Sequence, residues 1–235
     1  MNEDTIRKNL ETVGGIIARA AQTAGRNPDE ITLITVTKTF GIDVVRAAVA
    51  AGAKDLGENY VQEAREKITT LTGEDGPRPR WHFIGGLQKN KAKYAVRLFD
   101  LIHSVDSVEL AAELNKRAEI EGKRQEVLLQ VNISEEQQKS GVSPEGIIRL
   151  ARSVSELENL SVRGLMGMPP FGLDPEVSRP YFVTLRDLKE KIVAERISGV
   201  DMDELSMGMS NDYAVAVEEG ATMVRVGTAI FGPRY

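Results

Sequence analysis

Apolar and polar positions along this chain alternate between short runs typical of strands and longer stretches with helical spacing. The first run, Ile31 to Thr37, is rich in β-branched residues, which favour a packed strand because their side chains lose little freedom there. Before it, Thr5 to Ala24 places apolar residues at helical spacing, and Gly25 with Asn27-Pro28 ends that pattern. The sequence therefore predicts a helix before its first strand.

Seven more short apolar runs follow, and each is separated from the next by a segment of helical character. We predict strands within 54–59, 81–85, 101–104, 126–133, 162–166, 204–207 and 223–226. Between them we predict helices over 44–51, 61–69, 90–98 and 108–121, one opening at Ser143-Pro144, and one over about 178–195. Asp43 is the predicted N-cap of the helix that follows the first strand.

Eight strands that alternate with helices predict an α/β fold, a single (β/α)8 TIM barrel with an extra N-terminal helix. A doubly wound open sheet is the alternative. It is disfavoured because no glycine-rich dinucleotide turn follows the first strand. No internal repeat or linker divides the chain, so we expect one domain over 1–235.

Composition narrows the possible functions of this chain. The net charge is −5 with no block of like charges, which disfavours a nucleic-acid binder. There are no cysteines and two histidines, too few for a typical zinc site. No signal sequence opens the chain and no apolar run approaches the ~20 residues that cross a membrane, so we expect a cytoplasmic protein that binds no membrane.

Candidate functional residues lie where the predicted strands end, because the carboxyl ends of the strands carry the active sites of such barrels. These positions are Lys38, Asn59, His82 or Gly85, Ser104, Asn132, Met166, Ser206 and Arg225. Together they indicate a site for a polar small molecule, although each side chain is also suited to capping the next helix. Lys38 is either a structural cation paired with an acid or a nucleophilic amine.

Two loops near the end of the chain indicate a phosphate site. Ser210 follows the seventh predicted strand, and Gly227 and Thr228 follow the eighth. Loops after strands seven and eight commonly hold phosphate in such barrels through backbone N–H groups and hydroxyls. The alternative is simple N-capping by Ser210 and tight packing at Gly227.

A phosphate site opposite a strand-end lysine suits two ligands that condense with an amine. One is a sugar phosphate, as in an aldolase, and the other is pyridoxal 5'-phosphate. Arg225 favours the second, because it lies two residues before Gly227 and is placed to reach a pyridine nitrogen. An arginine has no acceptor and would keep that nitrogen unprotonated. The alternative for Arg225 is a barrel-interior cation paired with Glu58 or Glu204.

Segments along nearly the whole chain resemble the family of pyridoxal phosphate homeostasis proteins, which bind pyridoxal phosphate. They are VTKTF around Lys38, GENYVQE from Gly57, WHFIGGLQKNK from Trp81, SVDS from Ser104, LLQVNIS from Leu128, LMGMPP from Leu165, ELSMGMSND from Glu204 and VRVGTAIFG from Val224. The QKNK segment departs from the expected QSNK at its first lysine, Lys89, and retains Lys91.

The resemblance implies a fold-type III barrel, similar to the N-terminal domain of alanine racemase, with the cofactor held on a lysine. By position, Lys38 is the lysine of the internal aldimine, and Arg225 faces the pyridine nitrogen. The resemblance further implies that Ser210, Gly227 and Thr228 hold the phosphate. Asn59 would line the ring, and Ser206 would support the phosphate loop.

The implied function is cofactor binding for vitamin B6 homeostasis, and through it for amino and keto acid balance, without strong catalysis. Fold-type III racemases carry a second, β-rich domain that supplies another acid or base, and this chain stops just after the eighth strand, at Tyr235. The alternatives are a racemase-like enzyme and, less favoured, a Schiff-base aldolase. We expect a monomer whose partners are the cofactor and, as recipients, enzymes that lack it.

Two loops are predicted to be mobile and to control cofactor access. They are residues 137–141, QQKSG, and the segment from Met168 to Pro175.

Overall fold

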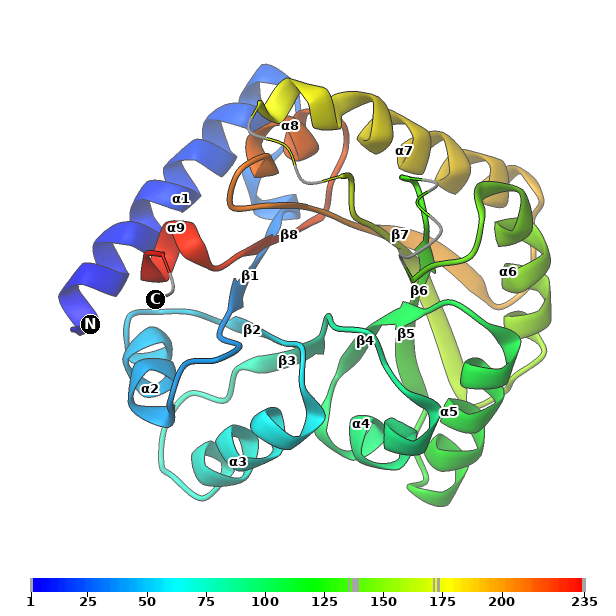
Figure 1. Ribbon diagram of the computed structural model, residues 1–235, viewed down its shortest axis with the longest axis horizontal. Coiled ribbons are helices and arrows are strands. Elements are labelled where there is room, and N and C mark those ends of the chain that lie inside the picture. The colour runs from blue at the N-terminus through cyan, green and yellow to red at the C-terminus, as the bar shows by residue number, and fades with distance from the viewer. Residues whose placement is uncertain (1, 135, 137–139, 171, 173, 234–235) are drawn as a thin grey trace.

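Eight parallel strands form a closed barrel in the computed structural model, which describes residues 2–134, 136, 140–170, 172 and 174–233 (Figure 1). The strands follow one another around the barrel in chain order: β1 (Thr32–Val36), β2 (Asp55–Glu58), β3 (Arg80–Phe83), β4 (Leu101–Val105), β5 (Gln125–Val131), β6 (Leu160–Gly167), β7 (Val200–Met209) and β8 (Met223–Val226). The predicted barrel is confirmed. The alternative open sheet is excluded, because β1 pairs with both β2 and β8.

Helices surround this barrel. They are α1 (Glu3–Thr23), α2 (Ile42–Ala50), α3 (Val61–Thr72), α4 (Ala92–Leu98), α5 (Val108–Ile120), α6 (Ile147–Ser155), α7 (Arg179–Ala194), α8 (Tyr213–Glu218) and α9 (Thr228–Phe231). The expected helix before the first strand is therefore present as α1.

Two predicted helix starts differ from the structure. Gly41, not Asp43, is the N-cap of α2, and Asp43 lies in the first turn, where it pairs with Arg46. An acid in the first turn interacts favourably with the helix dipole without capping the helix. Asp43 therefore does mark the start of α2, but as a first-turn residue and not as the N-cap. Ser143 is followed by a 3-10 turn, η3 (Pro144–Gly146), before α6 begins, and it makes no capping bond.

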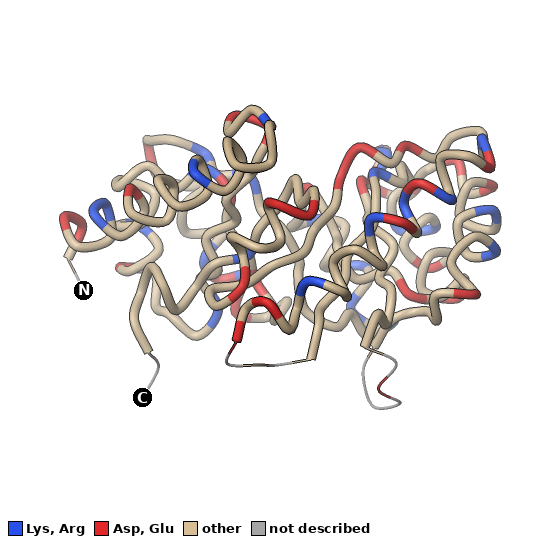
Figure 2. Tube along the Cα trace, turned by 90° about the horizontal axis from the view of Figure 1, so that it is seen from above, with Lys and Arg blue, Asp and Glu red and all other residues tan. Residues whose placement is uncertain are grey.

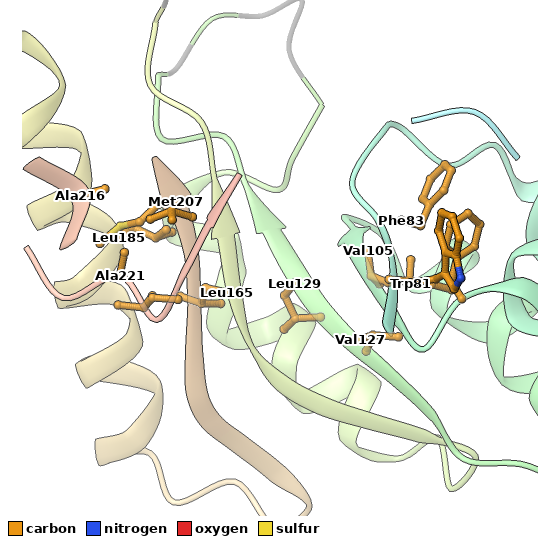
Figure 3. Close-up of a cluster of buried hydrophobic side chains, with 14 of the residues drawn as sticks. Trp81, Phe83, Val105, Val127, Leu129, Leu165, Leu185, Met207, Ala216 and Ala221 are labelled. Carbon is orange, nitrogen blue, oxygen red and sulfur yellow. The ribbon is translucent and has the colours of Figure 1, made fainter. Parts of the chain in front are cut away.

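The apolar core has two layers, one inside the barrel and one between the barrel and its helices. Alternate strand residues point to opposite faces of the sheet, so one set fills the barrel and the other meets the helices. The inner set is Ile34, Leu101, Leu128, Met166 and Met223, all nearly fully buried. Figure 3 shows part of the outer layer, in which Leu165 and Met207 of the strands face Leu185 and Ala216 of the helices.

α1 lies against the last elements of the chain. It packs beside α8 and α9 on the outside of the barrel, as Figure 1 shows. Asn9 donates a hydrogen bond to the carbonyl of Ile230 at 2.7 Å, and Arg26, just after α1, donates to the carbonyls of Val217 and Ala221. The first helix therefore supports the part of the barrel that ends in the predicted phosphate loop.

The surface carries both signs of charge. Segments of Lys and Arg and segments of Asp and Glu are interspersed along the helices in the view of Figure 2. Within the described residues, no helix has the length and apolar character that a membrane span requires.

Candidate functional site

A cavity of about 550 Å³ opens at the carboxyl end of the barrel. Its lining comes from the carboxyl ends of six strands, β1, β2, β3, β6, β7 and β8, and from the loops after them, as expected for this fold. The residues that line it are Val36, Lys38, Asn59, Ile84, Met168, Pro170, Gly172, Met209, Ser210, Asn211, Asp212, Arg225, Gly227, Thr228 and Ala229. Of the seven predicted site residues, all except Ser206 lie on this cavity.

Pairing of the first and last strands brings Lys38 and Arg225 to the same cavity. Ile34 of β1 lies opposite Arg225 of β8, and Lys38 follows β1 two residues after its end. Arg225 shares the inward face of the sheet with its neighbour Ile34, and Lys38 reaches the same cavity from the turn after β1. The two cations therefore share one site although the chain separates them widely.

The backbone on both sides of Lys38 is bound to one buried cluster of charges. Lys67 of α3 donates to the carbonyl of Thr37 at 2.8 Å and to Glu58 at 2.7 Å. Thr37 donates its hydroxyl to the same carboxylate oxygen of Glu58 at 2.6 Å. Glu63 accepts from Lys67 and from the amide of Thr39. This arrangement places the chain at Lys38 in a single conformation.

Thr39 has a backbone conformation that a β-branched residue rarely adopts. Its φ is 69°, in the left-handed region. Such a conformation costs about 1–3 kcal/mol and persists only where neighbouring contacts impose it. The hydrogen bond from the Thr39 amide to Glu63 is one such contact, so the turn that presents Lys38 is held against local strain.

Arg225 is a buried cation without an ion pair. Its side chain is 4% exposed, and no carboxylate among the described residues lies within ion-pair distance of it. It donates instead to the hydroxyl of Ser206 at 2.6 Å and to the carbonyl of Gly167 at 3.1 Å. The alternative pairing with Glu58 or Glu204 is wrong, because Glu58 binds Lys67 and Glu204 accepts from Thr222.

Burial without a paired acid lowers the pKa of Arg225. Desolvation lowers the pKa of Arg225 to about 10, and the carboxylate of Asp212 opposes part of that shift. The guanidinium still carries its charge at neutral pH. A buried charge is costly unless it is matched, so the site is suited to a ligand that brings negative charge or an acceptor to Arg225.

The predicted phosphate loops meet at Ser210. The hydroxyl of Ser210 accepts from the backbone amides of Gly227 at 3.1 Å and Ala229 at 3.3 Å. Thr228 lies between these two amides and also lines the cavity. Two amides and two hydroxyls therefore converge at one side of the cavity. They are the kinds of donor that bind an anion such as phosphate, which would take over the two amides from the Ser210 oxygen.

Asn59 and Ser206 occupy different positions relative to the cavity. Asn59 lines it, and its side-chain oxygen is buried without a hydrogen-bond partner. Ser206 is fully buried beneath Arg225 and does not line the cavity. It contacts His103 and Arg225 rather than Ser210, so it supports the site through Arg225.

Several lining residues were not among the predicted ones. Asp212 is held by the hydroxyl of Ser178 at 2.9 Å and the amide of Met209 at 2.7 Å. The loop after β6 adds Met168 and Pro170. Asp212 lies in the segment after the seventh strand that the sequence singled out. An acid at the start of a helix is typical of an N-cap, so the sequence alone gave no reason to place it at the cavity.

The two histidines lie in the barrel interior rather than at its mouth. His82 and His103 are fully buried, with ring nitrogens 3.0 Å apart. Of the two alternatives at the end of the third strand, His82 lies away from the cavity, whereas Gly85 lines a smaller cavity beside it and Ile84 lines both. Both rings are hydrogen-bonded. Within the described residues, no three His, Asp or Glu side chains group as metal ligands would.

A smaller cavity of about 320 Å³ adjoins the first and shares Asn59, Ile84, Met168 and Met209 with it. Gln130 and Ser140 complete its far side. Of the two loops predicted to control access, residues 137–139, 171 and 173 lie outside the described residues, and the predicted mobility stays a prediction.

Comparison with known proteins places this geometry in a family. Residues 4–235 match the family described as alanine racemase, N-terminal domain. The chain is 44% identical over 218 residues to a pyridoxal phosphate homeostasis protein of Aquifex aeolicus, covering 93% of each chain. It is also similar to PipY of Synechococcus elongatus, solved with PLP bound, with a TM-score of 0.80 and 38% identity over 92% of this chain and 100% of that one.

A more distant likeness concerns the fold alone. Alanine racemase from Streptomyces lavendulae superposes with a TM-score of 0.73 at 19% identity. That comparison covers 100% of this chain and 58% of the racemase. The barrel is thus the shared part.

Proposed function

Because this chain belongs to the family of the alanine racemase N-terminal domain, and within it to the pyridoxal phosphate homeostasis proteins, we propose that it binds pyridoxal 5'-phosphate in the cavity at Lys38. Its role is to hold the cofactor for homeostasis of vitamin B6, and through it of amino and keto acids. The observation that carries the proposal is Arg225, a buried cation without an ion pair among the described residues, which faces the same cavity as Lys38.

The residues present fit this cofactor. The cavity of about 550 Å³ is within the usual range of about 300–1,000 Å³ for small-molecule sites. Asn59 offers a buried side-chain oxygen that has no hydrogen-bond partner among the described residues. Such an orphaned polar atom is costly unless a ligand or water satisfies it.

Each end of the cofactor has a matching group. Ser210, Thr228 and the amides of Gly227 and Ala229 would hold the phosphate. Arg225 would donate to the pyridine nitrogen, and Ser206 would orient Arg225 from below. Asn59 would line the ring. When bound, the cofactor supplies an aldehyde, to which Lys38 would bind covalently, and an electron-withdrawing ring.

The same residues support a carrier rather than an efficient enzyme. A guanidinium donates but cannot accept, so Arg225 would leave the ring nitrogen unprotonated and the ring a weak electron sink. Racemisation by two bases needs a second proton-transfer group opposite Lys38. Among the described residues lining the two adjoining cavities, the other titratable groups are Arg225 and Asp212, and Asp212 is already bound by Ser178 and Met209.

The recipients in this proposal are enzymes that require the cofactor and lack it, and the protein acts as a monomer. A weak racemase-like activity is the second candidate, favoured by the match to the racemase domain. It would be detected as exchange of an amino acid α-proton in deuterium oxide. The carrier proposal predicts no exchange beyond that of free cofactor.

An absorbance spectrum with pyridoxal phosphate, before and after borohydride, tests the proposal. We expect a visible band that borohydride removes while fixing the cofactor to the peptide containing Lys38. Lys38→Ala abolishes the band, and Lys89→Ala, at an exposed lysine, is the matched control that retains it. A band that persists unchanged in Lys38→Ala overturns the assignment. A protein trapped only by a sugar phosphate supports an aldolase instead.

A further inference from the structure

A continuous chain of polar side chains crosses the barrel interior from one mouth to the other. Asp55 Oδ1 lies 2.9 Å from His82 Nε2, and His82 Nδ1 lies 3.0 Å from His103 Nε2. His103 Nδ1 lies 2.9 Å from the hydroxyl of Ser206, which accepts from Arg225 at 2.6 Å. The chain thus joins Asp55, at the amino end of β2, to the cation that lines the cavity.

The two ends of this chain determine its direction. A carboxylate can only accept, and a guanidinium can only donate. His82 therefore donates from Nε2 to Asp55, and as a neutral ring it accepts at Nδ1 from Nε2 of His103. A neutral His103 that donates from Nε2 has no proton on Nδ1, so this nitrogen accepts the Ser206 proton while the Ser206 oxygen accepts from Arg225. Both rings are then neutral and carry their proton on Nε2.

Burial supports this proton arrangement. His82, His103 and Ser206 are fully buried, and the side chain of Asp55 is 20% exposed. Desolvation is the largest cause that lowers the pKa of His103 well below its ordinary range, and the positive charges of Arg225 and Arg80 add to it, so this ring stays neutral. Of the charged groups near the ends, Arg80 adjoins Asp55 on β3, and Asp212 lies near Arg225.

We propose that Asp55, His82, His103 and Ser206 form a one-directional hydrogen-bond chain that positions Arg225 and links it to a counter-charge at the opposite mouth of the barrel. The four are positioning residues, since they act on the cofactor site through Arg225. In such a chain each bond polarises the next, so the donor that Arg225 presents depends on Asp55. The benefit to cofactor binding rests on the function proposed above, whereas the proton arrangement does not.

The proton arrangement is tested by two-bond ¹⁵N–¹H correlation spectra of protein labelled at histidine, without cofactor. The protein has two histidines in all, so the signals of both rings are resolved without overlap from others. We expect both to show a neutral ring protonated on Nε2. A proton on Nδ1 of either ring, or a charged ring at neutral pH, overturns the proposal. This measurement needs no variant and does not depend on cofactor binding.

Coupling along the chain is tested with Asp55→Leu and, as the matched control, Glu126→Gln. Glu126 lies at the same mouth and pairs with Arg80, so both changes remove one negative charge near that arginine. Asp55 contacts His82 and not His103. Asp55→Leu is nevertheless expected to end the exclusive protonation of His103 on Nε2. Glu126→Gln is expected to preserve it. Loss of the pattern in both variants, or in neither, overturns the coupling.

Cofactor affinity then tests the positioning role. We expect Asp55→Leu to raise the dissociation constant for pyridoxal phosphate about tenfold relative to Glu126→Gln, the loss of roughly one hydrogen bond to a charged group. Equal affinities in the two variants overturn the positioning role. If the unaltered protein shows both fixed rings but takes up no cofactor, the chain stands and the proposed function is the part that fails.

Discussion

At the scale of single residues, Lys67 holds together the hydrogen bonds that fix the backbone beside Lys38. It is 5% exposed at its side chain and contacts Glu58, Glu63 and the carbonyl of Thr37. Burial raises the pKa of Glu58 above its ordinary 4.5, and the bonds from Lys67 and Thr37 oppose that rise. The ammonium of Lys67 therefore stabilises the buried Glu58 carboxylate in its charged form.

Lys67→Met is expected to lower the free energy of unfolding by about 3 kcal/mol, because it leaves the Glu58 carboxylate buried without its cation. Urea denaturation measures the change. Lys116→Met, at an exposed position of α5, is the control and should change it by less than about 0.5 kcal/mol. Adding Glu58→Gln to Lys67→Met should restore part of the loss. Equal unfolding curves for the two lysine variants would contradict this account.

His103 predicts how stability depends on pH. The folded state holds the pKa of this ring well below the value of about 6.5 that it has when unfolded. Below that pH the ring binds a proton in the unfolded state but not in the folded state. The free energy of unfolding therefore falls as the pH decreases from about 6.5. The contribution has a slope of up to about 1.4 kcal/mol per pH unit.

Denaturation curves between pH 7.5 and 5, values chosen to bracket that titration, measure the effect against His103→Gln. The variant should lose this slope while keeping the slopes of the carboxylates, which titrate lower. Parallel pH profiles for the two proteins would show that His103 is not held neutral.

At the scale of elements, the end of β7 depends on a glycine. Gly208 has a φ of +89°, and an added Cβ would lie 2.5 Å from the Cβ of Ala216 in α8. Gly208→Ala is expected to cost about 2 kcal/mol or more, through backbone strain and displacement of α8. It should also weaken cofactor binding, since Ser210 lies two residues further on. Thermal unfolding and a cofactor titration measure the two effects.

Gly14→Ala is the matched control for this substitution. Gly14 lies within α1, and an added Cβ there meets no atom within 4 Å. Because glycine is a poor helix former, this change should raise the free energy of unfolding by about 0.8 kcal/mol. A destabilising Gly14→Ala would mean that α1 approaches another segment more closely than the structure shows.

Elements defined by local patterns were the ones predicted well. The eighth strand was predicted over Met223–Val226 and has those bounds, since a short apolar run between turn residues has few alternatives. The start of α2 was misplaced, because Asp43 and Gly41 are both suited to a helix start and the tertiary turn at Lys38 selects between them.

The chain from Asp55 to Arg225 was not predicted. Its members lie on β2, β3, β4, β7 and β8, so they meet only when the strands are in register. Lys38, Arg225 and the loops after β7 and β8 were predicted to share one site because strand ends in a barrel share one mouth, a rule that requires no register, and they line one cavity. Residues inside the barrel follow no such rule, and their partners require the structure.

At the scale of the whole molecule, cofactor binding should stabilise the fold. A ligand that binds only the folded state, present at a hundred times its dissociation constant, adds about 2.7 kcal/mol to the free energy of unfolding. Pyridoxal phosphate should therefore raise the melting temperature of the unaltered protein and raise it much less for Lys38→Ala. The same shift in both proteins would place the bound cofactor away from Lys38.

The contact between α1 and the last elements has a consequence for biosynthesis. Its buried residues Ile6, Val13, Ile17 and Ala20 leave the ribosome early, whereas α8 and α9, against which the helix packs, are made some two hundred residues later. Lys38 and Arg225 are separated in the same way, since β1 meets β8 only when the barrel closes. A nascent chain therefore has the lysine long before it has the arginine and the phosphate loops. We therefore expect the chain to take up the cofactor only after the barrel has closed.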